Sequence, residues 1–360
     1  MNETSTPEIR WLARSDWAEW DHFASQHPLG SLVHTSAWRA VIEESLPHIR
    51  GELCALIDPA DGSILAGVPV YLVRSILLGN RLVSIPFATL SDPLFRTDSD
   101  FPLFCNALRD ASDTRRIGRI EVRYSKSSPP DELSQWHIDA GFKHHTLRLD
   151  RAEPDILAAT HPRAVRAMIQ RGEKAGLTFR FDATETALRT FYRLFLRTRR
   201  RIALPPIPLA FFLSLHRHFA SSGALTIALV EHSGIPVGAG LILKHRDMTT
   251  IEYLGDAAEW RREGVNQCLY WGVIRAAIRE GRREFSFGRT ANSNQGLLRY
   301  KRRWGTEEHD LRALIHTRRK STANPVQHDS TARRAVRSLC AFAPMPVYRL
   351  IGYTCYRHMG

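Results

Sequence analysis

The sequence is short of lysine, cysteine and long apolar runs. Six of its 50 basic residues are Lys and the rest are Arg. The five cysteines are scattered and odd in number, and none forms a Cys-x-x-Cys pair, which argues against a disulfide framework or a zinc knuckle and for a reducing compartment. No run approaches the roughly 18 apolar residues of a membrane-spanning helix, and the N-terminal residues lack the apolar core of a signal peptide. These absences predict a cytoplasmic protein, or one attached peripherally to the inner face of a membrane.

Several catalytic motifs are absent as well. The sequence has no G-x-S-x-G elbow, no Walker loop and no G-x-G-x-x-G turn. It also lacks H-E-x-x-H, and His216 and His218 stand two positions apart, on different faces of a helix, so we expect no bound metal. What remains suits direct acyl transfer, in which an amine attacks an activated carbonyl without a covalent enzyme intermediate. That reaction needs an anion cradle for the donor, a positive charge near the developing oxyanion and a route for one proton.

The charge balance favours anionic partners. The chain carries a formal net charge of +13 and has a pI of about 10.0, while its hydrophobic content of 43% is ordinary for a globular protein. Anionic small molecules, lipid-linked sugars, tRNA and acidic lipid surfaces are all partners of suitable charge. An Arg-rich composition unrelated to any partner is an equally good explanation.

The two halves of the chain have the same order of expected elements. A chain of 360 residues is comfortable for two domains. Each half reads as helices, a hairpin, a strand, a helix and a strand, and the two hairpins can be laid on each other with Gly67 opposite Gly238. We therefore predict an α+β protein with two similar domains, at about 1–150 and 151–318, followed by a linker and a basic amphipathic tail at 319–360.

Capping and turn residues place the expected helices and strands. Helices are expected over Asp16–Gln26, Ser36–Ser45, Phe101–Ser112, Pro162–Ala175, Thr184–Thr198 and Leu209–Ser221, with a short helix starting at Pro129. Strands are expected over Leu53–Asp58, Ile64–Val73, Asn80–Pro86, Arg119–Tyr124, Leu225–Glu231 and Val237–His245.

The C-terminal tail is basic and aromatic. Pro344 and Pro346 divide it into two short amphipathic pieces. A terminal helix that packs back on the protein body is the simpler interpretation. Docking of the tail on a membrane surface through Arg, Tyr and Phe is the alternative.

The stretch Met248–Arg289 reads as strand, glycine-bearing turn, amphipathic helix and strand. Within it, the basic loop Arg261–Asn266 opens directly into the helix. Such a loop points unpaired backbone N–H groups and the positive end of the helix dipole at whatever lies in front of it. We predict that Arg261, Gly264 and Asn266 form a cradle for an anionic group of the donor, such as a pyrophosphate or a carboxylate.

Other residues in this half suit the charge and proton requirements. Lys301 stands out in an Arg-rich chain, because a lysine can place a compact charge on an oxyanion and can give up its proton once partly buried. A surface lysine in a basic patch is the alternative. Tyr253 and Asp256, at the end of the strand before the cradle, are candidates for handling the amine proton. A half-buried strand aromatic and a turn residue are the alternatives for these two.

Further basic residues are candidates for substrate binding. Arg166, Arg171 and Lys174 lie on the basic helix and suit the phosphates of a donor or an acceptor, or else form a solvated helix face. Arg289 is instead a candidate for the donor-binding site, together with the cradle residues. It begins a polar loop that runs to Gly296, and we expect it to orient that loop.

Three neighbouring segments resemble a known signature. Phe285–Arg289, Gly296–Lys301 and Trp304–Gly305 resemble the (D)FGR…G-x-x-x-F/Y-K-x-x-W/F-G signature of the FemAB-like branch of the GNAT superfamily. The cradle resembles the Gln/Arg-x-x-Gly-x-Gly/Ala turn with which GNAT acyltransferases grip a pantetheine pyrophosphate, with Asn266 at the last position. Ser286 stands where many relatives carry Asp. The C-terminal tail resembles that of members associated with exopolysaccharide and PEP-CTERM/exosortase loci.

The resemblance implies two tandem GNAT-like domains with mixed sheets flanked by helices. It implies that Lys301 supplies the stabilising charge in acyl transfer and that Tyr300 is the aromatic residue before it. The co-substrate would be an activated donor (acyl-CoA, acyl-carrier protein or aminoacyl-tRNA), with no tightly bound cofactor.

The predicted function is N-acyl transfer to an amine of a cell-envelope or exopolysaccharide precursor. Two alternatives stay open, an aminoacyl-tRNA-dependent peptidoglycan-precursor ligase and a non-catalytic polyanion-binding or scaffold protein. The long charged helical hairpin of some tRNA-dependent family members is missing, which weakens the first alternative.

Overall fold

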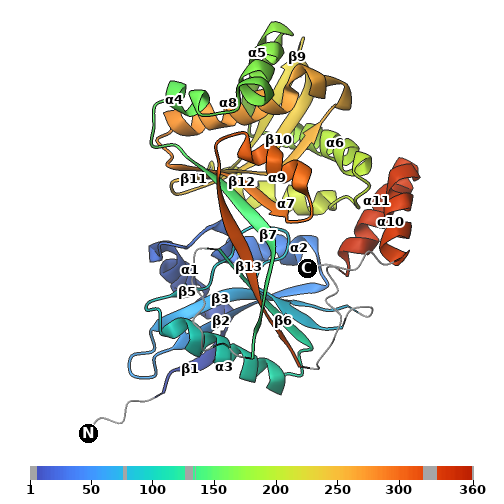
Figure 1. Ribbon diagram of the computed structural model, residues 1–360. Coiled ribbons are helices and arrows are strands. Elements are labelled where there is room, and N and C mark those ends of the chain that lie inside the picture. Colours follow the sequence, from blue (N-terminus) through green and yellow to red (C-terminus); the bar gives the residue numbers. More distant parts are fainter. Residues whose placement is uncertain (1–5, 76–78, 126–132, 134, 319–330, 359–360) are drawn as a thin grey trace. The chain divides into compact units, whose positions relative to one another are not determined.

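The computed structural model describes residues 6–75, 79–125, 133, 135–318 and 331–358. The chain forms two compact units (Figure 1). Unit 1 combines Met1–Gly141, Asp310–His328 and Tyr356–Gly360, and unit 2 combines Phe142–His309 with Asp329–Cys355. Within the residues described, no helix is both long enough and apolar enough to cross a bilayer.

Unit 1 is built on a mixed sheet. Its strands are β1 (Glu8–Leu12), β2 (Ile49–Ile57), β3 (Ile64–Val73), β4 (Arg81–Val83), β5 (Leu94–Phe95), β6 (Arg119–Tyr124) and most of β13 (Glu307–Thr317). Its helices are α1 (Trp17–Gln26), α2 (Ser36–Ser45) and α3 (Asp100–Thr114), with short 3-10 turns η1 (Arg14–Asp16) and η2 (Leu32–His34). The strand order is β1-β2-β3-β4-β6-β13, with β5 on β3. The pair β4 and β6 is parallel, and α3 provides the crossover that such a pair needs.

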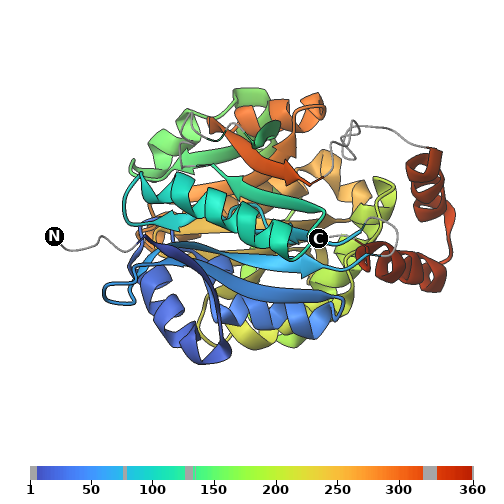
Figure 2. The same ribbon diagram turned by 90° about the horizontal axis from the view of Figure 1, so that it is seen from below.

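Alternation along β2 builds a core on each face of this sheet. Cys54 lies in the core that includes Phe104 of α3, while Leu53 lies in the core that includes Trp20 of α1. This follows from the two-residue period of a strand, which sends neighbouring side chains to opposite faces. Figure 2 shows α3 on one side of the strands and α1 and α2 on the other.

Unit 2 repeats this plan with more helices. Its strands are β7 (His137–Arg148, from Phe142 on), β8 (Leu177–Asp182), β9 (Leu225–His232), β10 (Ile235–His245), β11 (Met248–Asp256) and β12 (Glu284–Ala291). Its helices are α4 (Glu153–Ala158), η3 (Pro162–Arg166, a π turn), α5 (Ala167–Lys174), α6 (Glu185–Arg201), α7 (Leu209–Phe219), η4 (Ala258–Glu263), α8 (Val265–Arg279), α9 (Gln295–Arg302), α10 (Thr331–Phe342) and α11 (Met345–Tyr356). The strand order is β7-β12-β11-β10-β9-β8, and α8 is the crossover between the parallel strands β11 and β12.

Two strands are exchanged between the halves of the chain. β7 comes from the end of the first half, yet it pairs with β12 of unit 2. β13 comes from the end of the second half, yet it pairs with β6 of unit 1. For this reason the units are discontinuous in sequence and differ from the contiguous ranges 1–150, 151–318 and 319–360 that the sequence predicts.

The predicted α+β class with mixed sheets flanked by helices is confirmed. Each of the six main helices is present, although Pro162–Arg166 forms a π turn before α5, and the expected strand Asn80–Pro86 shortens to β4. The sequence reading misses β1, β5, β7, β8 and β13, which lack strong hairpin signals. The short helix expected from Pro129 and most of the expected linker lie outside the described residues.

Candidate active site

Strands β11 and β12 diverge within the sheet of unit 2. They pair in parallel only where Met248–Thr250 lies beside Glu284–Ser286. Beyond these residues β11 stays paired with β10, and β12 stays paired with β7. The facing edges of the two strands therefore no longer hydrogen bond to each other, which opens the sheet to other backbone partners.

A β-bulge in β12 marks the point of divergence. The register with β7 shifts between Ser286 and Arg289, and Gly288 has a φ of 70°, a left-handed conformation that favours glycine. The N–H of Gly288 donates to Ser286 Oγ (3.1 Å), which lies 2.8 Å from His144 Nε2. Ser286 thus holds the bulge in place.

Lys301 is buried against this bulge. Helix α9 starts at Asn294, whose Oδ1 accepts the N–H of Leu297 (3.1 Å), and its inner face carries Leu298 and Lys301. Lys301 is only 3% exposed, and its Nζ donates hydrogen bonds to Gly288 O (2.8 Å) and Arg289 O (3.2 Å). An ammonium has three N–H bonds, so one remains for a substrate atom.

Burial also changes the ionisation of Lys301. Desolvation lowers the pKa of its ammonium to about 7, against an opposing effect of the Glu252 carboxylate on β11. Lys301 is therefore close to half protonated at neutral pH. The interpretation of this residue as a solvated surface lysine does not hold.

Tyr300 lies between the lysine and the start of α8. Its ring centroid is 6.0 Å from that of Tyr270, in the second turn of α8. Its hydroxyl is enclosed and makes no hydrogen bond of normal geometry with the described residues. Burial, and then the neighbouring Tyr270, raises the pKa of Tyr300 well above its ordinary value, while Arg261 acts in the opposite direction. Tyr300 is thus a protonated phenol within electrostatic range of the cradle.

The cradle forms where the strand–turn–helix pattern predicts it. Chain direction changes at Gly264, which has a φ of 84° and precedes α8. A Cβ at this position would lie 2.1 Å from the carbonyl oxygen of Met168 on α5, so the turn and α5 fit only with glycine. Glycine has no side chain to cap the first N–H groups of α8, and they point out of the helix. The turn before α8 therefore has the backbone geometry that an anion cradle needs, and anion binding there stays a prediction.

The side chains of the cradle converge on Asp256 at the end of β11. Asp256 is 2% exposed, and its Oδ1 lies 2.5 Å from Arg201 Nη2. Asn266 Nδ2 donates to Oδ2 (3.1 Å), and Arg261 Nε lies 3.8 Å from the same oxygen. The Asn266 side chain thus faces Asp256, whereas Arg261 is half exposed and lies just before the N-terminus of α8. In this geometry Asp256 positions the cradle.

The other predicted residues surround this centre. Tyr253 packs edge-on against an aromatic cluster of α6 and α7, with its ring 5.1 Å from that of Phe212. Arg289 is exposed, and its Cζ lies 5.2 Å from the centroid of the Phe142 ring. Its backbone carbonyl accepts a hydrogen bond from Lys301 Nζ.

The basic helix lies beside the cradle. Arg171 forms a bidentate pair with Glu263 of η4, with both distances 3.0 Å. Arg166 Nη1 donates to Ala158 O (2.7 Å), and Lys174 is exposed. Gln267 Nε2 of α8 donates to Ala164 O (3.2 Å), which joins the two helices. Arg166 and Arg171 are thus both engaged within the protein, while Arg171 and Lys174 are exposed to solvent.

Sequence reasoning missed a buried polar layer behind Lys301. His145 is fully buried, and its Nδ1 lies 3.3 Å from Thr306 Oγ1, whose hydroxyl donates to Lys301 O (3.1 Å). Burial, and then the charge of Lys301, lowers the pKa of His145 to about 4, so this imidazole is neutral at pH 7. The adjacent pair His144-His145 in a strand was the available signal. Among the described residues no group of His, Cys, Asp and Glu side chains is arranged to hold a metal ion.

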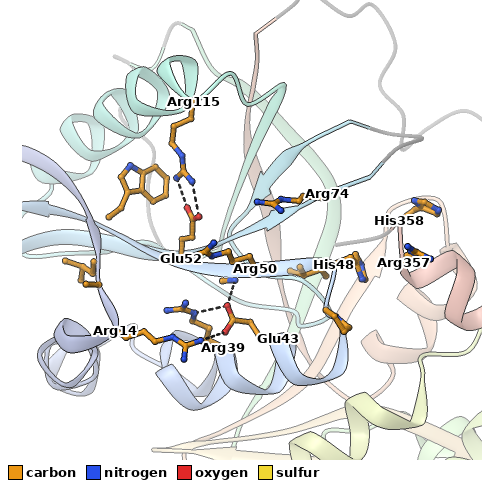
Figure 3. Close-up of a pocket in the computed structure, with 16 residues that line it drawn as sticks. Arg14, Arg39, Glu43, His48, Arg50, Glu52, Arg74, Arg115, Arg357 and His358 are labelled. Atoms are coloured by element: carbon orange, nitrogen blue, oxygen red, sulfur yellow. Dashed lines mark hydrogen bonds and ion pairs between the residues drawn. The ribbon is translucent and has the colours of Figure 1, made fainter.

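A separate basic pocket of about 1020 Å³ lies within unit 1 (Figure 3). Its lining includes two glutamates and six arginines, namely Glu43, Glu52, Arg14, Arg39, Arg50, Arg74, Arg115 and Arg357. Glu52 accepts two hydrogen bonds from Arg115 (2.6 and 2.9 Å), and Glu43 lies 3.3 Å from Arg39 Nε. No described carboxylate lies within ion-pair distance of Arg50 or Arg74. One end of the pocket is thus neutralised and the other is cationic.

Comparisons with known proteins agree with this geometry. Residues 160–302 match the sequence model of the acetyltransferase (GNAT) domain family. A crystal structure of FemX superposes with a TM-score of 0.63 at 13% identity, covering 86% of this chain and 97% of that one. A tandem GNAT protein from the clavulanic acid biosynthesis pathway gives 0.55 at 13% identity, covering 88% and 100%.

A third similar structure is the C-terminal domain of an Agrobacterium fabrum protein described as a lysylphosphatidylglycerol synthetase. It gives a TM-score of 0.52 at 14% identity and covers 83% of this chain and 92% of that one. The search of curated proteins finds no match. The matched domain spans the cradle, the diverging strands and Lys301. Residues 160–302 are therefore a GNAT acetyltransferase-family domain, and the fold of the chain is the one seen in FemX and in a tandem GNAT protein.

Proposed function

We propose that unit 2 transfers an acyl or aminoacyl group from an activated donor to an amine of a cell-envelope or exopolysaccharide precursor. The observation that carries this proposal is the burial of Lys301 at the β12 bulge, where two backbone carbonyls accept hydrogen bonds from its ammonium and leave one N–H for a substrate atom. A cation fixed in a low-dielectric setting stabilises developing negative charge better than the same cation in water.

The donor would lie between the diverging strands. An extended amide chain can pair with the edge of β11 that leaves β12, in the manner of an added strand. Its phosphate group would meet the first N–H groups of α8 beside Arg261. Acyl-CoA and acyl-carrier protein supply both the amide chain and the anion, whereas aminoacyl-tRNA supplies the anion alone.

The chemical steps follow from this placement. The amine nitrogen bonds to the donor carbonyl carbon, and the carbonyl oxygen accepts the remaining N–H of Lys301. The bond from that carbon to the donor sulfur or oxygen then breaks, and the leaving atom takes up a proton. We assign this donation to Tyr300, the residue before Lys301, whose buried phenol carries a proton at neutral pH. Tyr253 and Asp256, on β11 beyond the divergence, are the groups we assign to the amine proton.

Two observations support an anionic, envelope-type acceptor. The net charge of +13 favours an acceptor that carries phosphate or another anion. One structural neighbour is described as a lysylphosphatidylglycerol synthetase. The product in that name is an amino acid attached to an anionic phospholipid.

Intact-mass screening tests this function. Lipid-linked and sugar-linked amines would be incubated with acyl-CoA, acyl-carrier protein or charged tRNA. We expect one acceptor to gain the mass of one acyl or aminoacyl group. Ribonuclease should abolish the product only if aminoacyl-tRNA is the donor, and failure of every donor to give a product would contradict the proposal.

A second candidate function is binding of a phosphate-bearing polyanion by unit 1. The cationic end of the basic pocket, with Arg50 and Arg74, favours it. This function would be compatible with acyl transfer by unit 2, and would stand alone if no acyl product formed.

The basic pocket leads to a prediction about how RNA binding depends on salt concentration. We expect the Arg50→Ala/Arg74→Ala variant to bind single-stranded RNA more weakly and to reduce the magnitude of the slope of log K against log salt by about 1.4, because two phosphate contacts are lost. Fluorescence anisotropy across a salt series measures the slope. Arg10→Ala is the matched control, since Arg10 is exposed outside the pocket. Equal slopes for all three proteins would exclude the pocket as a polyanion site.

A further inference from the structure

Helices α10 and α11 expose an unusual amount of apolar surface. Among the described residues, their large exposed side chains are Leu339 (56%), Phe342 (82%), Val347 (47%), Leu350 (62%) and Tyr353 (55%). The spacing of three or four residues within each helix places them along one face. Figure 1 shows the two helices as a pair beside α6. Exposed apolar side chains grouped on helix faces mark an interaction site more often than an isolated exposed residue does.

The opposite face of the same helices is firmly packed on unit 2. Tyr348 is fully buried, and its hydroxyl donates to Leu204 O (2.8 Å). Arg200 Nε of α6 donates to Ala341 O (3.2 Å) at the end of α10. A Cβ on Gly352 would lie 2.3 Å from Pro206 O, so α11 sits directly on the loop before α7. The tail therefore does pack back on the body, as the simpler interpretation predicts, and its apolar face still points outward.

The charge of this segment identifies the partner. Residues 331–360 contain no Asp and no Glu, while Arg337 and Arg349 are exposed on α10 and α11. We propose that the outer face of α10 and α11 docks on an anionic membrane surface, with Phe342, Leu350 and Tyr353 entering the headgroup region. Arginines beside an apolar face attract acidic lipids, and aromatic side chains favour the membrane interface.

A second copy of the chain fits this face poorly. A symmetric contact would bring two segments without carboxylates together and leave their arginines facing one another, which costs free energy. An anionic lipid surface satisfies both the apolar side chains and the arginines. The inference goes beyond the proposed acyl transfer and does not depend on it.

Vesicle sedimentation with the full chain tests the proposal. We expect binding to phosphatidylglycerol/phosphatidylcholine vesicles that weakens as salt is raised, and little binding to pure phosphatidylcholine. The variant Phe342→Ser/Leu350→Ser/Tyr353→Ser should lose at least about tenfold in affinity. Ile235→Ser is the matched control, because Ile235 is 67% exposed on β10, away from the tail. It should bind as the wild type does.

A charge variant separates lipid binding from a folding defect. Arg337→Glu/Arg349→Glu keeps the apolar face and should also lose binding to anionic vesicles, with an unchanged circular dichroism spectrum. Three results would overturn the proposal. These are no binding of the wild type to anionic vesicles at low salt, wild-type binding by both multiple variants, or a wild-type dimer in analytical ultracentrifugation that the triple variant converts to a monomer.

Discussion

Replacing Lys301 with Met should lower kcat by about 10²–10³-fold, the loss typical of removing one preorganised oxyanion donor. Met has an unbranched apolar side chain that fills the buried site of Lys301 on the inner face of α9. It lacks the charge and the three N–H groups of the ammonium. KM for the acceptor should change little, because the lost contact forms only as the carbonyl oxygen gains charge. Steady-state kinetics with the acceptor found by mass screening measures both constants.

The neighbouring Arg302 provides the matched control for this substitution. Arg302 Nε donates to Glu308 Oε2 (2.8 Å) at the surface of the same helix. Arg302→Met should keep kcat close to that of the wild type, because Arg302 pairs with Glu308 at the surface. Loss of an exposed ion pair lowers the free energy of unfolding by only about 0–1 kcal/mol, so the variant should also stay folded. Lys301→Met should stay folded, although two carbonyls lose a donor at a cost of about 1–3 kcal/mol. Wild-type kcat in a folded Lys301→Met protein would remove Lys301 from the catalytic step.

Replacing Gly264 with Ala should destabilise the protein by about 2–5 kcal/mol, because left-handed strain and overpacking add at this position. The added Cβ would fall 2.1 Å from Met168 O, a backbone atom that cannot rotate away. Either α5 or the turn before α8 must shift, so donor affinity should fall as well. Urea denaturation followed by circular dichroism measures the free energy of unfolding.

Gly62→Ala isolates the steric part of this effect. Gly62 has a similar φ of 74°, but no atom lies within 4 Å of the position of its Cβ. Its substitution should cost only the left-handed strain, about 1–2 kcal/mol. Equal destabilisation by the two substitutions would mean that α5 does not pack on the cradle as described here.

The cradle was predictable because its signals are local. A strand, the turn Arg261–Gly264 and a helix follow one another in sequence, and only glycine suits the turn. The lysine signature was also local, since α9 places Leu298 and Lys301 one turn apart on the same face. Neither pattern, however, showed that Asn266 would face Asp256. The same carboxylate also pairs with Arg201, which is distant in sequence.

The strand exchange could not be predicted from the sequence. β7 and β13 join sheets built from the other half of the chain, and no hairpin turn or periodicity specifies a partner so distant. The same exchange brings His144 and His145 next to the β12 bulge. The polar layer behind Lys301 therefore depends on tertiary pairing, which explains why the sequence located the lysine and missed its surroundings.

The ionisation of Lys301 tests the central claim most directly. With only six lysines in the chain, isotope labelling of lysine gives few side-chain NMR signals, and the signal missing from Lys301→Met identifies Lys301. We predict that this amine titrates near pH 7, so that its charge, and with it kcat, is lost as pH rises through that value. Titration at the ordinary lysine value of about 10.4 would contradict a buried cation at the bulge.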